Sequence, residues 1–402
     1  SMVIIGDNAL RTGVATGSEN VIIGRNAGED LTSAVESCYV GYESGLNATT
    51  GNGNTVLGAH AVGAGVLTGS NNVVIGKLAG NDMTSAASNV LIGEDAGANL
   101  TTGVSNVVVG QGAGEALTSP ERAIFIGQNA GNGHDTENDN IGIGYEALGG
   151  SVAGGEYNVA IGNLTLDALT SGDNNIAIGY NAGSQLTSSS LNTIVGDAAG
   201  YTLTTGDGRN TIIGKDCFNG TLTTGNNNIA LGERCKVSTA AANFQFVIGS
   251  NLTSNGNSTT TIGYDTTEIA TAHGSASWAA VSDQRYKKDI EDSTAGLAFI
   301  DDLRPVTFKF KQKNELATDI YGYDANSTDT DGYTDEVAHG FIAQEIKAVL
   351  DNHPEIKAGQ EIWKQGADEK SNRQSVSHIG MIPMLVKAIQ ELSAKVKALE
   401  EA

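Results

Sequence analysis

The pentapeptide Asn72-Val73-Val74-Ile75-Gly76 decides the fold, because variants of it recur through most of the chain. The next two copies are Asn89-Val90-Leu91-Ile92-Gly93 and Asn106-Val107-Val108-Val109-Gly110. The closing glycine falls at residues 6, 24, 41, 58, 76, 93, 110, 127, 144, 162, 179, 196, 214, 232, 249 and 263, at intervals of 17 or 18 residues shortened to 14 at the last step. A period this constant predicts a solenoid or stacked array.

Each unit has the composition of a short strand that is apolar on both faces. The residue before the glycine and the residue two positions earlier share one face, and we expect them to point into the coil. The position between them, Val74 in the unit above, is then expected to face outward although it is also apolar. A strand that is apolar on both faces is buried on both, so we expect a parallel trimer whose subunits cover the outer face. A wide monomeric solenoid is the alternative.

The other positions of the repeat predict the corners and interior of the coil. Asn opens eleven of the sixteen units, and stacked amides would form a hydrogen-bonded ladder. A small residue three after the glycine predicts a tight corner, and a Leu or Met before Thr predicts a third apolar stack. Cys38 is assigned to an inward strand position, whereas Cys217 and Cys235 replace the small corner residue, so we interpret all three as buried apolar side chains.

The repeat resembles the head and shaft modules of trimeric bacterial adhesins and phage tail fibres. Those modules carry similar Asn-x-x-Ile-Gly units wound as β-rolls, and the resemblance covers residues 3–263. It implies an architecture and leaves the ligand open.

Composition excludes several classes of protein. The chain has 402 residues, 53 of them Gly, and a formal net charge of −23, so we expect it to repel nucleic acid. No apolar run approaches the ~20 residues of a membrane helix, and no signal peptide opens the chain. Because it begins within a repeat, at Val3-Ile4-Ile5-Gly6, we interpret it as a piece of a longer protein.

Little in the repeat predicts catalysis or metal binding. No His-x-x-x-His or Cys-x-x-Cys occurs, His60 and His134 are isolated, and we expect no cofactor. The stretch 131–139 is interpreted as a polar turn, with a cation site or receptor contact as the alternative. Paired carboxylates across coils would make a glycosidase, but the acidic side chains are expected in solvated turns. Examples are Glu29, Asp30, Asp82, Asp95 and Glu115.

The composition changes abruptly at Asp283, which suggests a repeat shaft over 1–263, a neck over 264–281 containing Trp278, and a smaller α+β domain over 282–402. We expect a short helix within 289–303, a strand over 305–311 and a helix over 340–350. The acidic stretch 314–337 lacks the closing Glu of a calcium loop and is interpreted as a solvated loop.

The last segment carries a heptad pattern. The apolar residues are Ile382, Leu385, Ile389, Leu392, Val396 and Leu399, at alternating steps of three and four. This pattern predicts a short coiled-coil seam, and its residue types alone would favour two strands. An ordinary amphipathic helix packed on its own domain is the alternative.

Four motifs follow one another in the second domain. They are Ser282-Asp283-x-Arg285-x-Lys287, Leu303-x-Pro305-Val306-x-Phe308, Gly340-Phe341-Ile342-Ala343-Gln344-Glu345 and Ala388-Ile389-x-Glu391-Leu392. Together they resemble the intramolecular chaperone auto-processing domain of endosialidase tailspikes, many other phage tail fibres and a few eukaryotic membrane-tethered transcription factors. The resemblance implies a trimeric chaperone that assembles the preceding β-structure and then cleaves itself off, with Ser282 and Lys287 as the catalytic pair.

The proposed chemistry follows from these residue types. A serine hydroxyl becomes a good nucleophile when a base removes its proton, and lysine is a base only when neutral. A neighbouring cation lowers a lysine pKa, and Arg285 and Lys288 are the candidates. The resemblance places the cut between Ser282 and Asp283, whereas an N→O shift would cut before Ser282. A hydroxyl that merely caps a helix is the alternative.

These observations predict a mainly β protein, a homotrimeric phage tail fibre or tailspike. The resemblance implies a place in the virion tail after synthesis in the host cytoplasm, and binding to a host-surface glycan or protein receptor. The alternatives are a glycan-degrading tailspike and a bacterial surface adhesin stalk. The scarcity of bulky aromatic residues for sugar stacking favours the first interpretation over the enzyme.

Overall fold

The computed structural model describes residues 1–12, 16–151, 154–220, 222–265, 267–275, 279–280, 284, 288–311, 313–316, 325–326, 337–356, 362–365 and 374–402. The chain divides into two compact units, Ser1–Ser282 and Asp283–Ala402. Each unit is described by itself.

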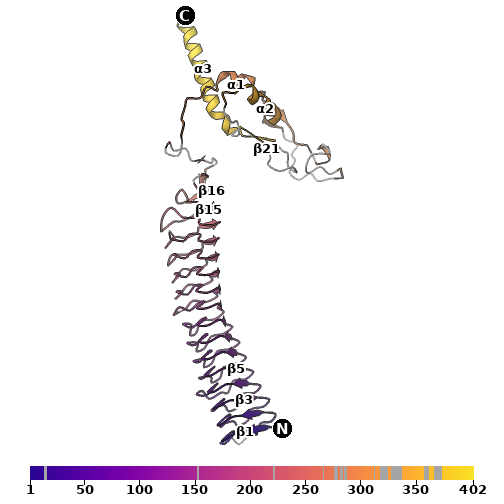
Figure 1. Ribbon diagram of the computed structural model, residues 1–402, viewed down its shortest axis with the longest axis vertical. Coiled ribbons are helices and arrows are strands. Elements are labelled where there is room, and N and C mark those ends of the chain that lie inside the picture. The colour runs from indigo at the N-terminus through magenta and orange to yellow at the C-terminus, as the bar shows by residue number, and fades with distance from the viewer. Residues whose placement is uncertain are drawn as a thin grey trace. The chain divides into compact units, whose positions relative to one another are not determined.

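The first unit is a β-solenoid, as the repeat predicted, and Figure 1 draws its strands as a continuous stack. Each strand from β1 to β15 pairs in parallel with the next; Val73 in β5, for example, lies opposite Val90 in β6. The strands are β1 (Val3–Ile5), β2 (Val21–Ile23), β3 (Cys38–Val40), β4 (Thr55–Leu57), β5 (Val73–Ile75), β6 (Val90–Ile92), β7 (Val107–Val109), β8 (Ile124–Ile126), β9 (Ile141–Ile143), β10 (Val159–Ile161), β11 (Ile176–Ile178), β12 (Thr193–Val195), β13 (Thr211–Ile213), β14 (Ile229–Leu231), β15 (Gln245–Ser250), β16 (Thr259–Tyr264), β17 (Thr267–Ala272) and β18 (Ala279–Ala280). The last two pairings, β16–β17 and β17–β18, are antiparallel, so the parallel stack ends at β16.

The two faces of each strand are the reverse of what we expected. The central residue points inward and is fully buried, as with Ile22, Val74 and Phe125, whereas the residues on either side of it are partly or largely exposed. The coil is narrow: a Cβ added to the corner residue Gly131 would lie 2.4 Å from the Phe125 ring. Only one inward side chain per three-residue strand fits beneath such a corner. Cys38 is a flanking residue and is therefore partly exposed, so its inward assignment was also wrong.

The asparagine ladder is confirmed. The Asn89 side-chain amide donates to Asn72 Oδ1 at 3.1 Å and to the Gly103 carbonyl at 2.9 Å. Asn89 Oδ1 in turn accepts the backbone N–H of Asn106 at 2.9 Å. The same pattern runs from Asn54 to Asn106 and from Asn140 to Asn228, with Ala123 between the two runs. These buried amides satisfy backbone groups at a corner that water does not reach.

The small-residue corner and the third apolar stack are also confirmed. The small corner residues are fully buried, including Cys217 and Cys235, and the hydrogen bond to Cys235 together with burial raises the pKa of the Cys217 thiol. Glycine closes the units from Gly6 to Gly249 because its φ lies between +129° and +153° and the next coil is close: a Cβ on Gly76 would lie 2.2 Å from the Gly93 carbonyl oxygen. The buried apolar stack comprises Leu31, Met83, Leu100, Leu117, Leu186 and Leu203.

The second unit has two short sheets and three α-helices among its described residues. Its elements are α1 (Leu297–Asp302), β19 (Val306–Phe308), η2 (Lys313–Glu315), β20 (Ala338–Gly340), α2 (Ala343–Asn352), β21 (Trp363–Gln365), β22 (Gln374–Val376), η3 (Ile379–Met381) and α3 (Ile382–Glu400). β19 pairs with β20 and β21 with β22, both antiparallel. Phe299, Ile346, Ile362 and Met381 form its core. The short helix, the strand and the two longer helices expected from the sequence are all present.

Candidate functional site

The residues that the sequence assigns to self-cleavage fall mostly outside the described residues. Ser282, Asp283, Arg285 and Lys287 lie there, as do Trp278 and the acidic stretch 327–336. Lys288 is described and is exposed to solvent. The geometry of the candidate site therefore begins with the segment that follows Lys288 and leads to α1.

That segment is held at its far end by the C-terminal helix. Glu391 Oε2 of α3 accepts the backbone N–H of Leu297, the first residue of α1, at 3.0 Å. A Cβ on Gly296 would lie 2.5 Å from this carboxylate, so a larger residue there would displace the Glu391 side chain from its present position. A carboxylate at a helix N-terminus satisfies a free N–H group and interacts favourably with the helix dipole. The sequence analysis quoted Glu391 as part of a motif but did not predict this partner.

Glu345, the glutamate of the third motif, also has a structural partner. Arg304 and Glu345 form a two-pronged ion pair, with Arg304 Nε donating to Glu345 Oε2 at 2.9 Å. The hydrogen bonds to Arg304 lower the pKa of the Glu345 carboxyl. Because both side chains are exposed, the pair adds little stability but fixes the start of α2 beside the chain that leaves α1.

His353 links the ends of α1 and α2. Its Nε2 lies 2.8 Å from Asp302 Oδ2 and its Nδ1 lies 2.7 Å from Glu355 Oε1. The hydrogen bonds to Asp302 and then to Glu355 raise the pKa of the imidazole. The ring also packs edge-on against Phe299 in the core. The protonated histidine therefore joins two carboxylates that flank the core.

The heptad seam on α3 is exposed in the single chain. Leu399 is 78% exposed and Ile389 is 66% exposed, and the other four seam residues are also open to solvent. A different side of the helix, carrying Met384, Ala388 and Glu391, faces the rest of the domain. The helix therefore packs on its own domain through that side and leaves the seam open, and the coiled coil stays a prediction.

The shaft exposes a second apolar surface, which we call the strand stripe. It is formed by the residues on either side of the buried centre of each strand. Its residues are partly or largely exposed, with 37% at Ile75, 39% at Ile213 and 43% at Ile176. Other members above a third exposed are Ile126, Ile161, Ile178, Leu231 and Ile248. A continuous apolar surface of this kind is unusual on a monomer and marks an interaction surface.

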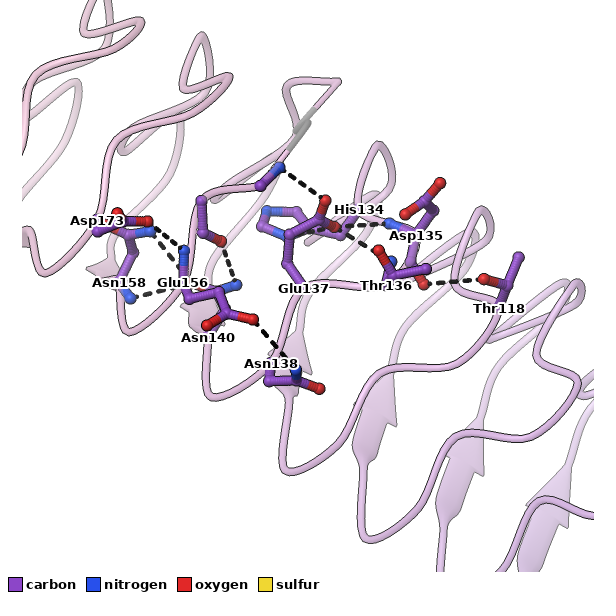
Figure 2. Close-up of polar contacts among 12 residues, drawn as sticks. Thr118, His134, Asp135, Thr136, Glu137, Asn138, Asn140, Glu156, Asn158 and Asp173 are labelled. Atoms are coloured by element: carbon purple, nitrogen blue, oxygen red, sulfur yellow. Dashed lines mark hydrogen bonds and ion pairs between the residues drawn. The ribbon is translucent and has the colours of Figure 1, made fainter.

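The stretch 131–139 is a turn, as its sequence suggested, with Asp135 and Thr136 exposed but two polar side chains buried within it. Figure 2 shows His134 beside Glu137, and both are buried, at 0% and 4% exposed. His134 takes the place of a leucine in the third apolar stack, neither ring nitrogen has a hydrogen-bond partner, and burial lowers its pKa to about 4. The Glu137 carboxylate accepts backbone N–H groups of Asp135, Thr136 and Gly154. The polar residues around His134 suggested an exposed position. Its burial follows from the repeat register, in which His134 corresponds to Leu117 of the preceding coil.

A second, more exposed ladder runs beside this stretch. Asn138 Nδ2 donates to Glu156 Oε1 at 3.1 Å, and the Glu156 backbone N–H donates to Asp173 Oδ1 at 2.9 Å (Figure 2). The carboxylates of the shaft thus take part in coil-to-coil bonding. Similarly, His60 is not isolated, since it lies 3.1 Å from Glu43 of the preceding coil.

Asp167 is the one shaft carboxyl, among those described, whose pKa burial raises strongly, to about 6, and the charge of Glu146 adds to this effect. Its Oδ1 atom is enclosed and has no hydrogen-bond partner. No group of three or more His, Cys, Asp or Glu side chains in the described part of the chain is arranged to hold a metal ion. Among the same residues, no helix has the length and apolar character needed to cross a membrane.

Comparison with protein families assigns the second unit. Residues 282–353 match the family model described as the chaperone of endosialidase. Searches of curated proteins and of solved structures found no match to the chain. The C-terminal unit thus carries an endosialidase-type chaperone domain, and a β-solenoid of about 17-residue coils precedes it. This domain type implies self-cleaving protease activity, and its attachment to a β-solenoid is typical of phage tail fibres and tailspikes.

Proposed function

We propose that this chain is a phage tail-fibre protein that attaches the virion to a host-surface glycan or protein. Its C-terminal domain, residues 282–402, assembles the shaft, residues 1–263, as a homotrimer and then releases itself next to Ser282. Residues 264–281 form the neck between them. The observation that carries the proposal is the chaperone-family match immediately after a β-solenoid.

The strand stripe supports association between copies of this chain. Its side chains repeat at the spacing of neighbouring strands, about 4.8 Å, along the whole parallel stack. A partner that covers such a stripe along its length must have the same repeat, and another copy of the chain in parallel register does. Because the centre of each strand is buried and the two residues beside it face outward, each strand offers two apolar residues, rather than one, to the neighbouring subunits.

The release reaction uses Ser282 as nucleophile and Lys287 as base. Neutral Lys287 takes the hydroxyl proton of Ser282, and the oxygen attacks a backbone carbonyl. The peptide C–N bond then breaks, and its nitrogen takes the proton back from Lys287 and leaves as an amine. The ester that remains is hydrolysed by water to leave two chains. Arg285 and Lys288 are the cations that would lower the Lys287 pKa. One turnover per chain suffices. The scissile bond lies on one side or the other of Ser282, as the sequence analysis set out.

Denaturing gel electrophoresis tests the release. Wild type is compared with Ser282→Ala and Lys287→Ala, each expressed as the full chain. We expect wild type to yield a fragment of roughly 13 kDa, about 120 residues long, that is absent from both variants. A single full-length wild-type band would contradict self-cleavage. Mass spectrometry of the fragment identifies the bond, and light scattering of the intact chain tests the trimer separately.

Asp167 favours a second candidate function, glycan hydrolysis. A carboxyl with a raised pKa can act as a general acid, and retaining and inverting glycosidases pair one with a second carboxylate. Glu146, whose charge reaches Asp167, is the candidate partner. Incubation with host surface polysaccharide should release reducing ends from wild type and not from Asp167→Asn. If wild type releases no reducing ends, glycan hydrolysis is contradicted and host attachment remains as the proposed function.

A further inference from the structure

An apolar cavity of about 300 Å³ lies in the chaperone domain beside the first turn of α3. Its lining comes from α1, from the chain that follows it, from the start of α2 and from η3 and α3. The lining residues are Ile300, Leu303, Pro305, Phe341, His378, Met381 and Leu385. Leu385 also belongs to the heptad seam, so the cavity and the seam form one continuous apolar surface.

The heptad register identifies the side chain that would reach this cavity. With Ile382 at position a and Leu385 at position d, Val386 takes position e, and Met381 takes position g of the preceding heptad. The later e positions hold Ser393 and Glu400, so position e is apolar only at the level of the cavity. Val386 is 48% exposed in the single chain.

The domain itself occupies the opposite side of α3. Ala388, at the next g position, is buried, and Glu391 caps α1 from a position on the same side. In a parallel coiled coil the g side of one helix faces the e side of its neighbour. The Val386 side chain of one copy therefore meets Met381 and the cavity of the next.

We propose that this cavity is the docking site for Val386 of a second copy of the chain. The inference rests on the proposed homotrimer and names the contact that fixes each chaperone domain against the neighbouring helix. Contacts along the α3 seam alone would hold the helices together while each domain touched only its own helix. Insertion of Val386 into the adjacent domain adds a contact between each domain and the neighbouring helix, at the level where the domain joins α3.

Engineered disulfides test the contact in the full chain. Ser282→Ala is included throughout so that the domain stays attached. The double variant Met381→Cys with Val386→Cys should give disulfide-linked dimers and trimers on mild oxidation with oxidised glutathione, seen on non-reducing gels. The matched control pairs Met381→Cys with Ser393→Cys, the next e position. That pair, the single variants and the Ser282→Ala chain, which retains only the native cysteines, should stay at background.

Two outcomes would overturn the proposal. If the chain is a trimer by light scattering but the Met381→Cys/Val386→Cys variant forms no more disulfide-linked product than the Met381→Cys/Ser393→Cys variant, Val386 does not enter the cavity. The proposed function would be unaffected by that result. A monomer by light scattering would contradict both the cavity contact and the proposed homotrimer. As a second measurement, Val386→Lys should lower the thermal transition of the chaperone domain in the trimer, whereas Ser393→Lys should leave it unchanged; equal effects would count against the cavity contact.

Discussion

The shaft and the chaperone domain each leave an apolar surface exposed, but the two surfaces differ in how strictly they would fix the alignment of one copy against another. The strand stripe repeats every coil, so sliding one copy past another by one coil restores almost the same contacts. The α3 seam has six apolar positions, and the cavity beside it lies at the level of one of them, Leu385. A long periodic surface gives affinity without register, whereas a short seam with a cavity at one level gives register. The difference explains why a repeat shaft would benefit from a separate assembly domain.

The same contrast holds inside each unit. Shaft coils are joined by buried ladders that recur, whereas the chaperone domain depends on single contacts such as the one between Glu391 and Leu297. Damage to the shaft should therefore be local and damage to the domain should be general. The following experiments test that contrast, beginning with the largest expected effect.

Removing one amide from the asparagine ladder should have the largest effect. Asn158→Ala takes away an acceptor for the Asn175 backbone N–H, bonded at 3.0 Å, and a donor to the Gly172 carbonyl, bonded at 2.9 Å. Each buried group left without a partner costs about 1–3 kcal/mol, so we expect a loss of about 4 kcal/mol from the surrounding coils. Hydrogen exchange should show faster exchange near Asn158 and unchanged protection in the chaperone domain.

Ala123 supplies the matched control, because it stands where a ladder asparagine would. Ala123→Asn should join the two runs of amides and slow exchange in the neighbouring coils, by about 1 kcal/mol for the added hydrogen bonds. If Asn158→Ala changes protection equally in both units, the shaft is not the locally stabilised structure that the ladder implies.

The ladder shows how far sequence reasoning reached in the shaft. The period, the stacked amides and the Leu stack are repeated many times, so their positions could be predicted. Which strand face turns inward could not, because Val74 and its neighbours Val73 and Ile75 are all apolar. That choice depends on the width of the coil beneath its corner, and no single unit encodes it. The buried His134 was missed because its surroundings are polar.

In the chaperone domain the sequence predicted the helices, and it proposed a cleavage site that stays a prediction. Motif order identified Ser282 and Lys287 as candidates because the chemistry needs a hydroxyl and a base. The Glu391 cap on Leu297 joins residues 94 positions apart and depends on how α3 lies against α1. Such a long-range contact follows from tertiary packing, which motif spacing does not specify.

His134 makes the shaft sensitive to acid. The folded shaft keeps this histidine neutral until the pH approaches 4, whereas the unfolded chain takes up a proton near pH 6.5. The unfolded state thus binds more protons between these values, and stability falls as the pH drops from 6.5 towards 4, by about 3 kcal/mol for the local structure. Denaturation of the shaft at pH 7 and pH 4.5 measures this loss.

His134→Leu restores the residue found in neighbouring coils, and it should both raise stability at pH 7 and reduce the acid-dependent loss. His60→Leu is the control, since His60 is partly exposed and paired with Glu43. An acid response that persists unchanged in His134→Leu would show that other groups in the shaft cause it.

A smaller effect is expected at the cap of α1. Glu391→Ala leaves the Leu297 N–H without its carboxylate, and lost caps cost about 1 kcal/mol. Because α1 supplies the core residue Phe299, the whole domain should melt at a lower temperature, whereas the shaft should not change. Glu400→Ala, near the free end of α3, is the control. A change confined to exchange at Leu297 would show that this contact acts only locally.

The smallest effect is expected at His353, where stability should fall as the pH rises, the opposite of the response expected from His134. Asp302 and Glu355 raise the pKa of His353, so the folded domain holds this proton more tightly than the unfolded chain does. The stabilisation is complete below about pH 6.5 and is lost as the pH rises through the raised pKa of the folded state. Melting curves between pH 6 and pH 9 should therefore show the chaperone domain weakening where the shaft does not, and His353→Gln should flatten the response. If the two units instead lost stability together with rising pH, His353 would not be the cause of the loss. The shaft, which favours a neutral His134, and the chaperone domain, which favours a protonated His353, would then not differ in their response to pH.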